Sequence, residues 1–291
     1  MTYAGVELGG TKCIAILAEG PGRIVARETV ATTSPDETLT ALRAILARWQ
    51  ADHGFAALGI GSFGPINVDP ASPTYGRMRA TPKPGWAHAD ILAPLAQAAK
   101  VPAVLDTDVN GAALAEMRWG SGRGMHDFAY ITVGTGVGVG LIVNGRPTRG
   151  FGHSELGHLR VARLANDAWP GSCPFHGDCV EGLASGAALA VRLGEELASA
   201  PPDHVAWDSV TWTLAQLCHA IVLAAAPRRI AIGGGVPARQ PHLLARIEAK
   251  LVESLNGYVE LPMTRGFVCV PELGDDAGPL GAIALAMMAA G

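Results

Sequence analysis

The first thirty residues alternate short apolar runs with turn-forming residues. Strand-like runs occupy positions 6–8, 13–17 and 24–30, and they are separated by Gly9-Gly10-Thr11-Lys12 and by Gly20-Pro21-Gly22. Runs of this length bounded by glycine and proline are typical of β-strands joined by tight turns. The pattern predicts a three-stranded meander whose first turn is rich in glycine.

The same pattern returns in the middle of the chain. Apolar runs at residues 129–133 and 139–143 flank Gly134-Thr135-Gly136-Val137-Gly138, and Asn144-Gly145 follows them. Asn-Gly is the strongest short signal for a two-residue hairpin turn. The strand, glycine loop and strand unit therefore occurs twice, which indicates an internal repeat.

Helical signals separate and follow these two repeats. Ser34, Pro35 and Glu37 form an N-cap, a first-turn proline and an N3 acid, and they predict a helix that runs toward Trp49. The other predicted elements are strands at 57–61, 101–105, 229–232 and 267–270, helices at 89–99, 110–119, 184–198 and 209–225, a turn at 233–235 followed by a helix, and a final helix. Mixed strands and helices in both halves predict two α/β units, with Gly120-Ser121-Gly122-Arg123-Gly124 as the expected linker.

The two glycine loops are candidates for phosphate binding. In each loop bare backbone N–H groups and a threonine hydroxyl can approach phosphate oxygens without a Cβ in the way. The alternative is that these glycines serve hairpin geometry alone. Residues 59–64 match G-x-G-x-x-G, but the Pro65 to Pro70 stretch after them is not a helix signal, so we reject a Rossmann site. No P-loop motif occurs either.

Composition describes a compact soluble protein. Hydrophobic residues make up 49% of the chain, charged residues 16%, and the net charge is −4. No run of Lys and Arg occurs, so neither nucleic acid nor a membrane surface is an expected partner. The longest apolar stretch, near residues 220–226, is too short to span a bilayer, and residues 1–5 lack a signal-peptide pattern. Cys13, Cys218 and Cys269 are expected core residues of a reducing compartment, which favours the cytoplasm.

Four potential metal ligands lie close together in the sequence. Cys173, His176 and Cys179 share one turn-rich segment, and His158 precedes it. Zinc takes thiolate and imidazole ligands in a tetrahedron, and a complete Cys/His set leaves no open position for a substrate. We therefore expect a structural Zn²⁺. The alternative is a pair of buried cysteines beside an incidental histidine, and His153 is a rival for the fourth ligand.

Carboxylates supply the candidate chemistry. Asp108 follows a predicted strand and precedes a predicted helix, where α/β sheets present residues to ligands. A carboxylate there can accept the proton of an alcohol during phosphoryl transfer. The alternative is that Asp106 and Asp108 cap the helix; beside two phosphate loops we favour a catalytic Asp108 and a structural Asp106. Glu155 and Glu181 flank the metal ligands and suit sugar hydroxyls, with solvated surface glutamates as the alternative.

Several of these motifs, in this order, resemble those of the ROK family of sugar kinases. They are Glu7-Leu8-Gly9-Gly10-Thr11-Lys12, Gly134-Thr135-Gly136-Val137-Gly138, Glu155-Leu156-Gly157-His158 and the cysteine segment, and the resemblance covers nearly the whole chain. The cysteine segment, with Gly61-Ser62-Phe63-Gly64-Pro65 and Asp106-Thr107-Asp108-Val109-Asn110, is similar to the bacterial fructokinase branch. The resemblance implies a two-lobed, actin-like and ribonuclease H-like ATPase fold of the α/β class, Mg-ATP as phosphoryl donor, and a hexose bound between the lobes.

By position, the resemblance also implies a role for individual residues. Asp108 is the base, and His158, Cys173, His176 and Cys179 hold zinc. Many ROK members carry Asp where this chain has Glu7, and this position is the implied metal contact. Many also carry Asn where this chain has Thr107. The implied sugar contacts are Glu155, His158, Glu181, Pro65 and Thr107. The expected nucleotide contacts are Gly9, Gly10, Thr11, Lys12, Gly134, Thr135, Gly136, Gly233, Gly234 and Gly235.

These expectations define two lobes, an activity and the alternative functions. We expect an N-terminal lobe over residues 1–119, completed by the C-terminal helix 278–291, and a C-terminal lobe over 120–277 with the zinc-binding loop. The expected activity is ATP-dependent phosphorylation of fructose at its 6-hydroxyl by a homodimer, with mannose, glucose or an N-acetylhexosamine as alternative substrates. A ROK-type repressor would need a DNA-binding region, whereas the first glycine loop begins within ten residues of Met1. A zinc hydrolase would need an open metal position.

Overall fold

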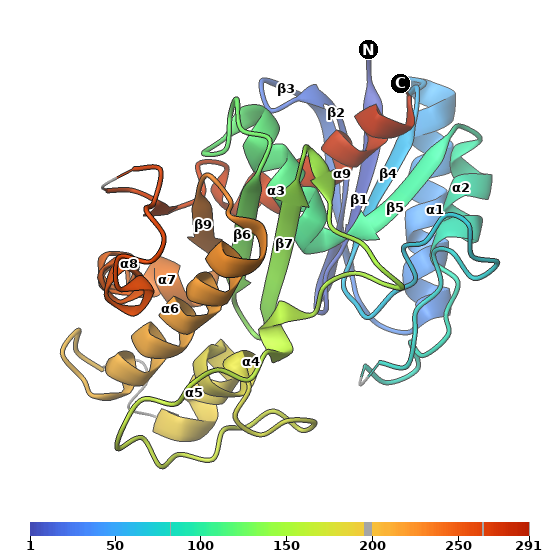
Figure 1. Cartoon of the computed structure of the whole chain (residues 1–291). Helices are drawn as coiled ribbons and strands as arrows, with labels where there is room; N and C mark the ends of the chain where they lie inside the picture. The colour runs from blue at the N-terminus through green and yellow to red at the C-terminus, as the bar shows by residue number, and fades with distance from the viewer. Residues whose placement is uncertain (82, 195–199, 264, 291) are drawn as a thin grey trace. The chain divides into compact units, whose positions relative to one another are not determined.

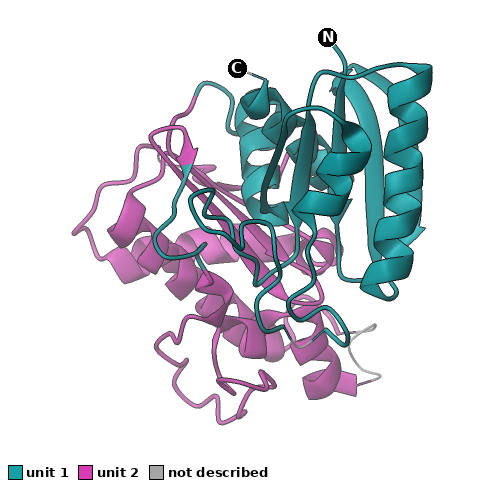
Figure 2. Cartoon of the chain, turned by 90° about the vertical axis from the view of Figure 1, so that its right-hand side faces the viewer, with its two compact units in different colours: residues 1–124, 147–154, 273–291 teal, residues 125–146, 155–272 magenta. Residues whose placement is uncertain are grey.

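The computed structural model describes residues 1–81, 83–194, 200–263 and 265–290. Contacts divide the chain into two compact units (Figure 2). Unit 1 comprises Met1–Gly124, Pro147–Ser154 and Leu273–Gly291, and unit 2 comprises Met125–Arg146 and Glu155–Glu272. Each unit contains one five-stranded sheet with its own helices, so the predicted α/β class is correct for both.

The sheet of unit 1 begins with the predicted meander (Figure 1). Strands β1 (Tyr3–Leu8), β2 (Lys12–Gly20) and β3 (Arg23–Ala31) are antiparallel neighbours. Strands β4 (Leu58–Ser62) and β5 (Ala103–Thr107) extend the sheet parallel to β1, which gives the order β3-β2-β1-β4-β5. Because β4 and β5 are parallel, the segments that follow them begin at the same edge of the sheet.

The sheet of unit 2 repeats this topology. Its strands are β6 (Phe128–Val133), β7 (Val137–Val143), β8 (Arg146–Pro147), β9 (Ile230–Gly233) and β10 (Val268–Cys269), in the order β10-β9-β6-β7-β8. The predicted hairpin turn between β7 and β8 is confirmed, since Asn144 and Gly145 have φ angles of 52° and 74°, the positive values that a type I′ turn requires. The internal repeat therefore extends from the meander to a whole five-stranded sheet.

Unit 1 packs helices on both faces of its sheet. Helix α1 (Pro35–Asp52) begins as predicted, because the Ser34 hydroxyl accepts a hydrogen bond of 3.3 Å from Glu37 N. Buried side chains of α1 and of α2 (Leu92–Ala99) share one apolar cluster with Val6 and Leu8 of β1. A second cluster joins the opposite face to α3 (Asp108–Trp119) and α9 (Ala277–Ala289).

Glycines allow α9 to lie directly on the strands. A Cβ on Gly59 of β4 would overlap the Ala282 carbonyl oxygen, and a Cβ on Gly5 of β1 would lie 2.9 Å from Ala282 Cβ. Gly281 is in similarly close contact with the backbone of Gly111 in α3. The same face of β1 carries Glu7, whose carboxylate lies where a Cβ on Gly278 would be.

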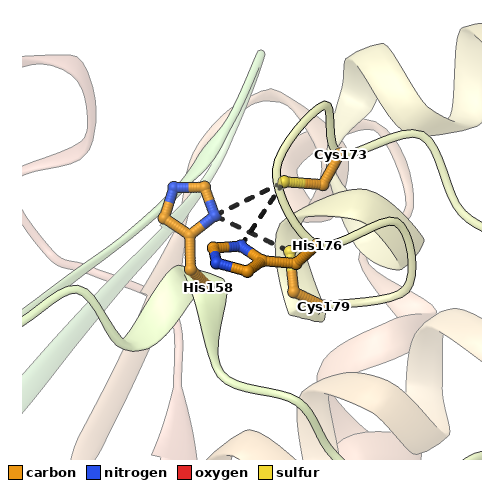
Figure 3. Close-up of side chains that lie close together, drawn as sticks. All are labelled: His158, Cys173, His176 and Cys179. Atoms are coloured by element: carbon orange, nitrogen blue, oxygen red, sulfur yellow. Dashed lines mark hydrogen bonds between the residues drawn. The ribbon is translucent and has the colours of Figure 1, made fainter. Parts of the chain in front are cut away.

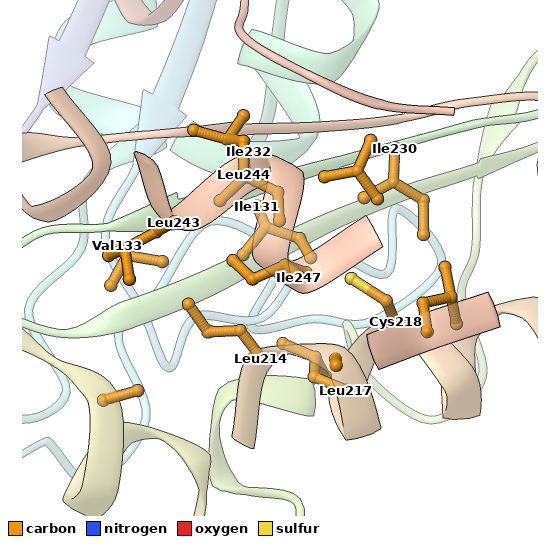
Figure 4. Packing of buried hydrophobic residues seen from close by; sticks show 14 of the residues in the cluster. Ile131, Val133, Leu214, Leu217, Cys218, Ile230, Ile232, Leu243, Leu244 and Ile247 are labelled. Atoms are coloured by element: carbon orange, nitrogen blue, oxygen red, sulfur yellow. The ribbon is translucent and has the colours of Figure 1, made fainter. Parts of the chain in front are cut away.

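Unit 2 is organised around one large apolar cluster (Figure 4). Side chains of β6 and β9, such as Ile131 and Ile232, pack against Leu214 of α6 (Ala206–Ala225) and Ile247 of α8 (His242–Leu255). The short helices α4 (Val180–Ala184) and α5 (Gly186–Leu193) contribute Val180 and Leu189 to the same cluster. Leucine, isoleucine and valine at these positions exclude water from the sheet face.

The predicted helix 184–198 and the predicted turn 233–235 differ from the structure. The helix expected over 184–198 begins only after Ser185, whose hydroxyl accepts from Ala188 N at 3.1 Å and caps α5. Residues 195–198 of that prediction, and residue 291 of the expected final helix, lie outside the described residues. The turn expected at 233–235 is a direct change from strand to helix, since Gly233 ends β9 and Gly235 begins α7 (Gly235–Arg239).

The segment 120–124 is held in place rather than loose. Ser121 is buried, and its N–H and hydroxyl both donate to the Glu116 carboxylate, at 2.7 and 2.8 Å.

Of the cysteines expected in the core, Cys13 and Cys218 are buried, whereas Cys269 is only partly so. Among the helices that the structure describes, none combines the length and apolar character needed to cross a membrane.

Candidate functional site

The four predicted metal ligands of unit 2 lie together (Figure 3). His158 ends a short 3-10 helix (Leu156–His158), Cys173 and His176 belong to a tight loop, and Cys179 caps helix α4. Their ligand atoms all lie within 4.8 Å of one another. The loop closes through paired backbone hydrogen bonds between Cys173 and Gly177, of 3.1 and 2.9 Å.

The spacing of these atoms fits a tetrahedral zinc site. His158 Nδ1 lies 3.6 Å from Cys173 Sγ and 3.7 Å from Cys179 Sγ, and His176 Nδ1 lies 3.8 Å from Cys173 Sγ. Zn–S bonds of about 2.3 Å and Zn–N bonds of about 2.0 Å give tetrahedron edges of roughly 3.3–3.8 Å. Two thiols and two imidazoles at such separations are the donor set that zinc prefers, so the residues fit the implied ion.

Burial keeps the Cys179 thiol protonated while no metal is bound. Its side chain is fully buried, and burial, together with the Cys173 thiol and the Glu181 carboxylate, raises its pKa to about 11. A bound metal would replace that proton, because the thiolate is the ligand. His153, the rival ligand, belongs to unit 1 and accepts a hydrogen bond of 3.1 Å from Ile66 N.

Glu181 connects the metal site to the second glycine loop. One carboxylate oxygen accepts from Val137 N at 3.0 Å, and the other lies 3.9 Å from His158 Nε2. Five residues further along, Gly186 N donates to Gly134 O at 2.7 Å. Both ends of the loop between β6 and β7 are therefore fixed by the segment that begins at the predicted metal ligand Cys179. Glu155 lies at the start of the 3-10 helix that carries His158, and its side chain is exposed.

The two predicted nucleotide segments of unit 2 lie at one edge of its sheet. Strands β6 and β9 are parallel and pair Thr132 with Gly233, so both glycine segments follow neighbouring strand ends. Gly234 has a φ of 94°, and a Cβ there would lie 2.6 Å from Val133 O. Glycine is needed at this position both for the backbone angle and for the close approach.

In unit 1, the cap of helix α3 comes from a neighbour of Asp108. The alternative interpretation had expected Asp108 itself to cap this helix. The Thr107 hydroxyl is the N-cap of α3 and accepts from Asn110 N at 3.2 Å. Asp106 is fully buried and accepts from Thr107 N at 2.7 Å and from Asn110 Nδ2 at 2.8 Å. Asp108, the first residue of α3, is half-buried and accepts from Val109 N at 2.9 Å. Asp106 is thus held within the turn by hydrogen bonds, and its structural role stays a prediction. Thr107, an implied sugar contact, is 4% exposed and its hydroxyl is used by the cap.

The first glycine loop has an open side and a lysine beside it. Gly9 N donates to Lys12 O at 3.1 Å, and nothing lies within 4 Å of a Cβ built on Gly10. Lys83 Nζ donates to Gly10 O at 2.5 Å, which puts a positive charge next to this loop. Lys83 is not recognisable from the sequence alone, because a single lysine among prolines carries no motif.

Two further residues of unit 1 have defined surroundings. Pro65 follows a cis peptide bond, and its carbonyl accepts from Arg79 N at 2.8 Å. Glu7 lies on β1 one residue before Leu8, and burial raises its pKa to about 7 despite the opposing charges of Lys12 and Arg27. A carboxylate that is costly to ionise is a candidate for pairing with a cation.

Two sheets of the same strand order, each with a glycine loop between its first two strands, define the actin-like, ribonuclease H-like fold class of sugar kinases. A crystal structure of a ROK hexokinase from Thermus thermophilus matches with a TM-score of 0.78 and 27% identity, over 99% of this chain and 98% of that chain. A ROK family glucokinase from Streptomyces griseus, in complex with glucose and AMPPNP, matches with a TM-score of 0.76 and 25% identity, over 99% and 100% of the two chains.

The chain belongs to the ROK family, whose sequence model matches residues 3–289. Among its curated relatives, the fructokinase of Zymomonas mobilis is 39% identical over 292 residues, covering 99% of this chain and 97% of that protein. The family resemblance drawn from the motifs is therefore confirmed.

Proposed function

We propose that this protein is an ATP-dependent fructokinase that transfers the γ-phosphoryl group to the 6-hydroxyl of fructose. The observation that carries the proposal is the position of Asp108. It begins helix α3 at the carboxyl end of β5, where α/β sheets present ligand-binding residues. The Thr107 hydroxyl caps the helix, so the position of Asp108 at this turn is not explained by helix capping.

Asp108 acts as the general base in this proposal. Its carboxylate orients the sugar hydroxyl and accepts the hydroxyl proton as the sugar oxygen bonds to the γ-phosphorus, while the bond from that phosphorus to the bridging oxygen breaks and ADP leaves. Phosphoryl transfer requires little covalent chemistry from the protein, so orientation and charge neutralisation provide most of the rate enhancement. The proposed sugar contacts are Glu155, His158, Glu181, Pro65 and Thr107.

The glycine loops bind the nucleotide. The proposed phosphate contacts are Gly9–Lys12, with Lys83 beside Gly10, and Gly134–Gly136, through backbone N–H groups and the Thr11 and Thr135 hydroxyls. Gly233–Gly235 is proposed to lie beside the adenosine. Magnesium, with Glu7 among its contacts, would neutralise phosphate charge, and the His158, Cys173, His176 and Cys179 set would hold a structural zinc ion.

Fructose is the preferred substrate because the fructokinase relative matches over nearly its full length. Glucose, mannose and N-acetylmannosamine are the comparison substrates, and the glucose-bound family member is the reason to include glucose. A site that pairs every sugar hydroxyl rejects an analogue that leaves one protein group unpaired. The difference between fructose and glucose is therefore expected in kcat/KM, not only in KM.

A coupled assay tests the proposal directly. ADP release is measured with each sugar in the presence of Mg-ATP, and the fructose product is converted by phosphoglucose isomerase and glucose-6-phosphate dehydrogenase, which report the 6-phosphate and not the 1-phosphate. We expect the highest kcat/KM with fructose. Absence of sugar-dependent ADP release across the panel would refute the kinase assignment, and a higher kcat/KM with another sugar would refute the substrate alone.

A further inference from the structure

A short segment of the chain leaves unit 2 and returns to it. Unit 2 contains Met125–Arg146 and resumes at Glu155, whereas Pro147–Ser154 belongs to unit 1. We call these eight residues the 147–154 segment. It lies in sequence between strand β8 and the proposed sugar contact Glu155, and its own role in the proposed reaction is unassigned.

Arg149 ties this segment to the turn that carries Asp108. Its guanidinium forms an ion pair with Asp106, whose side chain is fully buried while that of Arg149 is 30% exposed. Asp106 also accepts from Thr107 N and Asn110 Nδ2, so one carboxylate joins Arg149 to both sides of the β5–α3 turn. A buried carboxylate requires such partners, because burial without them strongly disfavours its charged form.

Two more hydrogen bonds tie the same segment to the turn after β4. His153 Nε2 accepts from Ile66 N at 3.1 Å, and Phe151 O accepts from Arg79 Nη2 at 2.8 Å. Arg79 N in turn donates to Pro65 O. Since β4 and β5 pair in parallel, with Ser62 opposite Thr107, the 147–154 segment joins the two turns that begin at this edge of the sheet.

We propose that Arg149 is a positioning residue for catalysis: by pairing with Asp106 it fixes the β5–α3 turn and thereby the direction of the Asp108 carboxylate. This inference rests on the proposed kinase function. A misplacement of about 1 Å at a reacting group can cost on the order of a hundredfold in rate, and Asp108 is only two residues from the carboxylate that Arg149 holds. The effect is therefore on kcat, because the nucleotide loops are not part of this set of contacts.

The rival role for Arg149 is direct contact with a substrate. Arginine has five N–H donors, and only the bond from Nη2 to Asp106 involves its guanidinium among the described side chains. A double-mutant cycle separates the two roles. If Arg149 acts through Asp106, the effects of Arg149→Met and Asp106→Asn are not additive; if it binds substrate itself, they add.

The experiment compares Arg149→Met, Arg149→Lys, Asp106→Asn and the double variant, with Arg146→Met as the matched control. Arg146 is an exposed arginine of β8, three residues before Arg149. With fructose and Mg-ATP, we expect kcat of Arg149→Met and of Asp106→Asn to fall about ten- to a hundredfold, with the KM for ATP within about twofold of the parent. The lysine variant should recover part of kcat, and the control should match the parent.

The cycle also covers the case in which Arg149→Met does not fold. Asp106→Asn keeps the shape of the side chain and an acceptor for Thr107 N, and thermal unfolding of each variant separates lost fold from lost turnover. A kcat for Asp106→Asn within about threefold of the parent, or additive losses in the double variant, would overturn the inference. A parent protein without sugar-dependent ADP release would instead remove the proposed function.

Discussion

Replacing Glu7 by glutamine should make the protein more stable at neutral and alkaline pH. Glu7 lies on the face of β1 that packs against α9, and its carboxylate occupies the space left by Gly278 near the start of that helix. Burial raises its pKa from 4.5 to about 7, while Lys12 and Arg27 act in the opposite direction. Glutamine has nearly the same shape and no charge, so it imitates the protonated acid.

The sign and size follow from the two pKa values. Below about pH 4.5 the acid is protonated in both the folded and the unfolded chain, and ionisation costs nothing. As pH rises from 4.5 to about 7, the unfolded chain ionises first, so the free energy of unfolding falls. At roughly 1.4 kcal/mol per pKa unit, the loss above pH 7 is about 3 kcal/mol. The positive end of α9 offsets about 0.3–1 kcal/mol of this loss, which leaves a gain of about 2–3 kcal/mol for Glu7→Gln.

Urea unfolding at a series of pH values measures this difference, without nucleotide or magnesium. We expect Glu7→Gln to match the parent near pH 4.5 and to exceed it increasingly up to pH 8. The control is Glu28→Gln on β3, where the carboxylate is 38% exposed and paired with Arg48. Exposed ion pairs of this kind contribute about 0–1 kcal/mol. A difference between Glu7→Gln and parent that stays constant from pH 4.5 to 8 would refute the reasoning.

Four further substitutions test the proposed site. Asp108→Asn should reduce kcat on the order of a hundred- to ten-thousandfold while calorimetry still detects ATP and fructose binding; a rate within threefold of the parent would exclude Asp108 as the base. Gly136→Val should weaken ATP binding, because its Cβ would lie 2.6 Å from Glu181 Oε2; unchanged nucleotide affinity would count against this loop. Cys173→Ser and Cys179→Ser should lower both the zinc content per chain and the melting temperature; a parent protein without zinc, or variants with parental stability, would contradict the structural metal.

The Cys173→Ser and Cys179→Ser variants also test whether the proposed metal supports binding of ATP as well as binding of the sugar. Glu181 lies next to His158 and accepts from Val137 N in the second glycine loop. Loss of the metal is therefore expected to raise the KM for ATP as well as the KM for the sugar. The comparison is with Cys218→Ser, since Cys218 is a buried cysteine of α6 outside the metal cluster.

Local signals in the sequence determined much of this protein. The alternation of apolar runs and glycine turns identified both meanders, and Ser34 with Glu37 identified the start of α1. Such features depend on neighbours in the chain, so they can be recognised without the fold. The cluster of Cys173, His176 and Cys179 could be predicted for the same reason, since one short segment supplies all three.

The tertiary structure decided what depends on residues far apart in sequence. Helix α9 packs on β1 and β4 because glycines in both strands leave no side chain in its way, and no local pattern pairs these glycines with Ala282. The division of the expected helix at Ser185 follows from a cap that competes with helix continuation. Lys83 beside Gly10, and Arg149 beside Asp106, are contacts between segments whose sequences carry no shared motif.

The sequence by itself thus determined which residues can perform chemistry, and only the tertiary structure decided which of them are engaged by buried partners. Read along the chain, Asp106 and Asp108 are both candidates for capping α3. In the fold, burial and hydrogen bonds assign Asp106 to Arg149 and Asn110, and Thr107 to the helix cap. The physical reason is that a buried polar group must be paired, and its partner can belong to a segment that is distant in sequence.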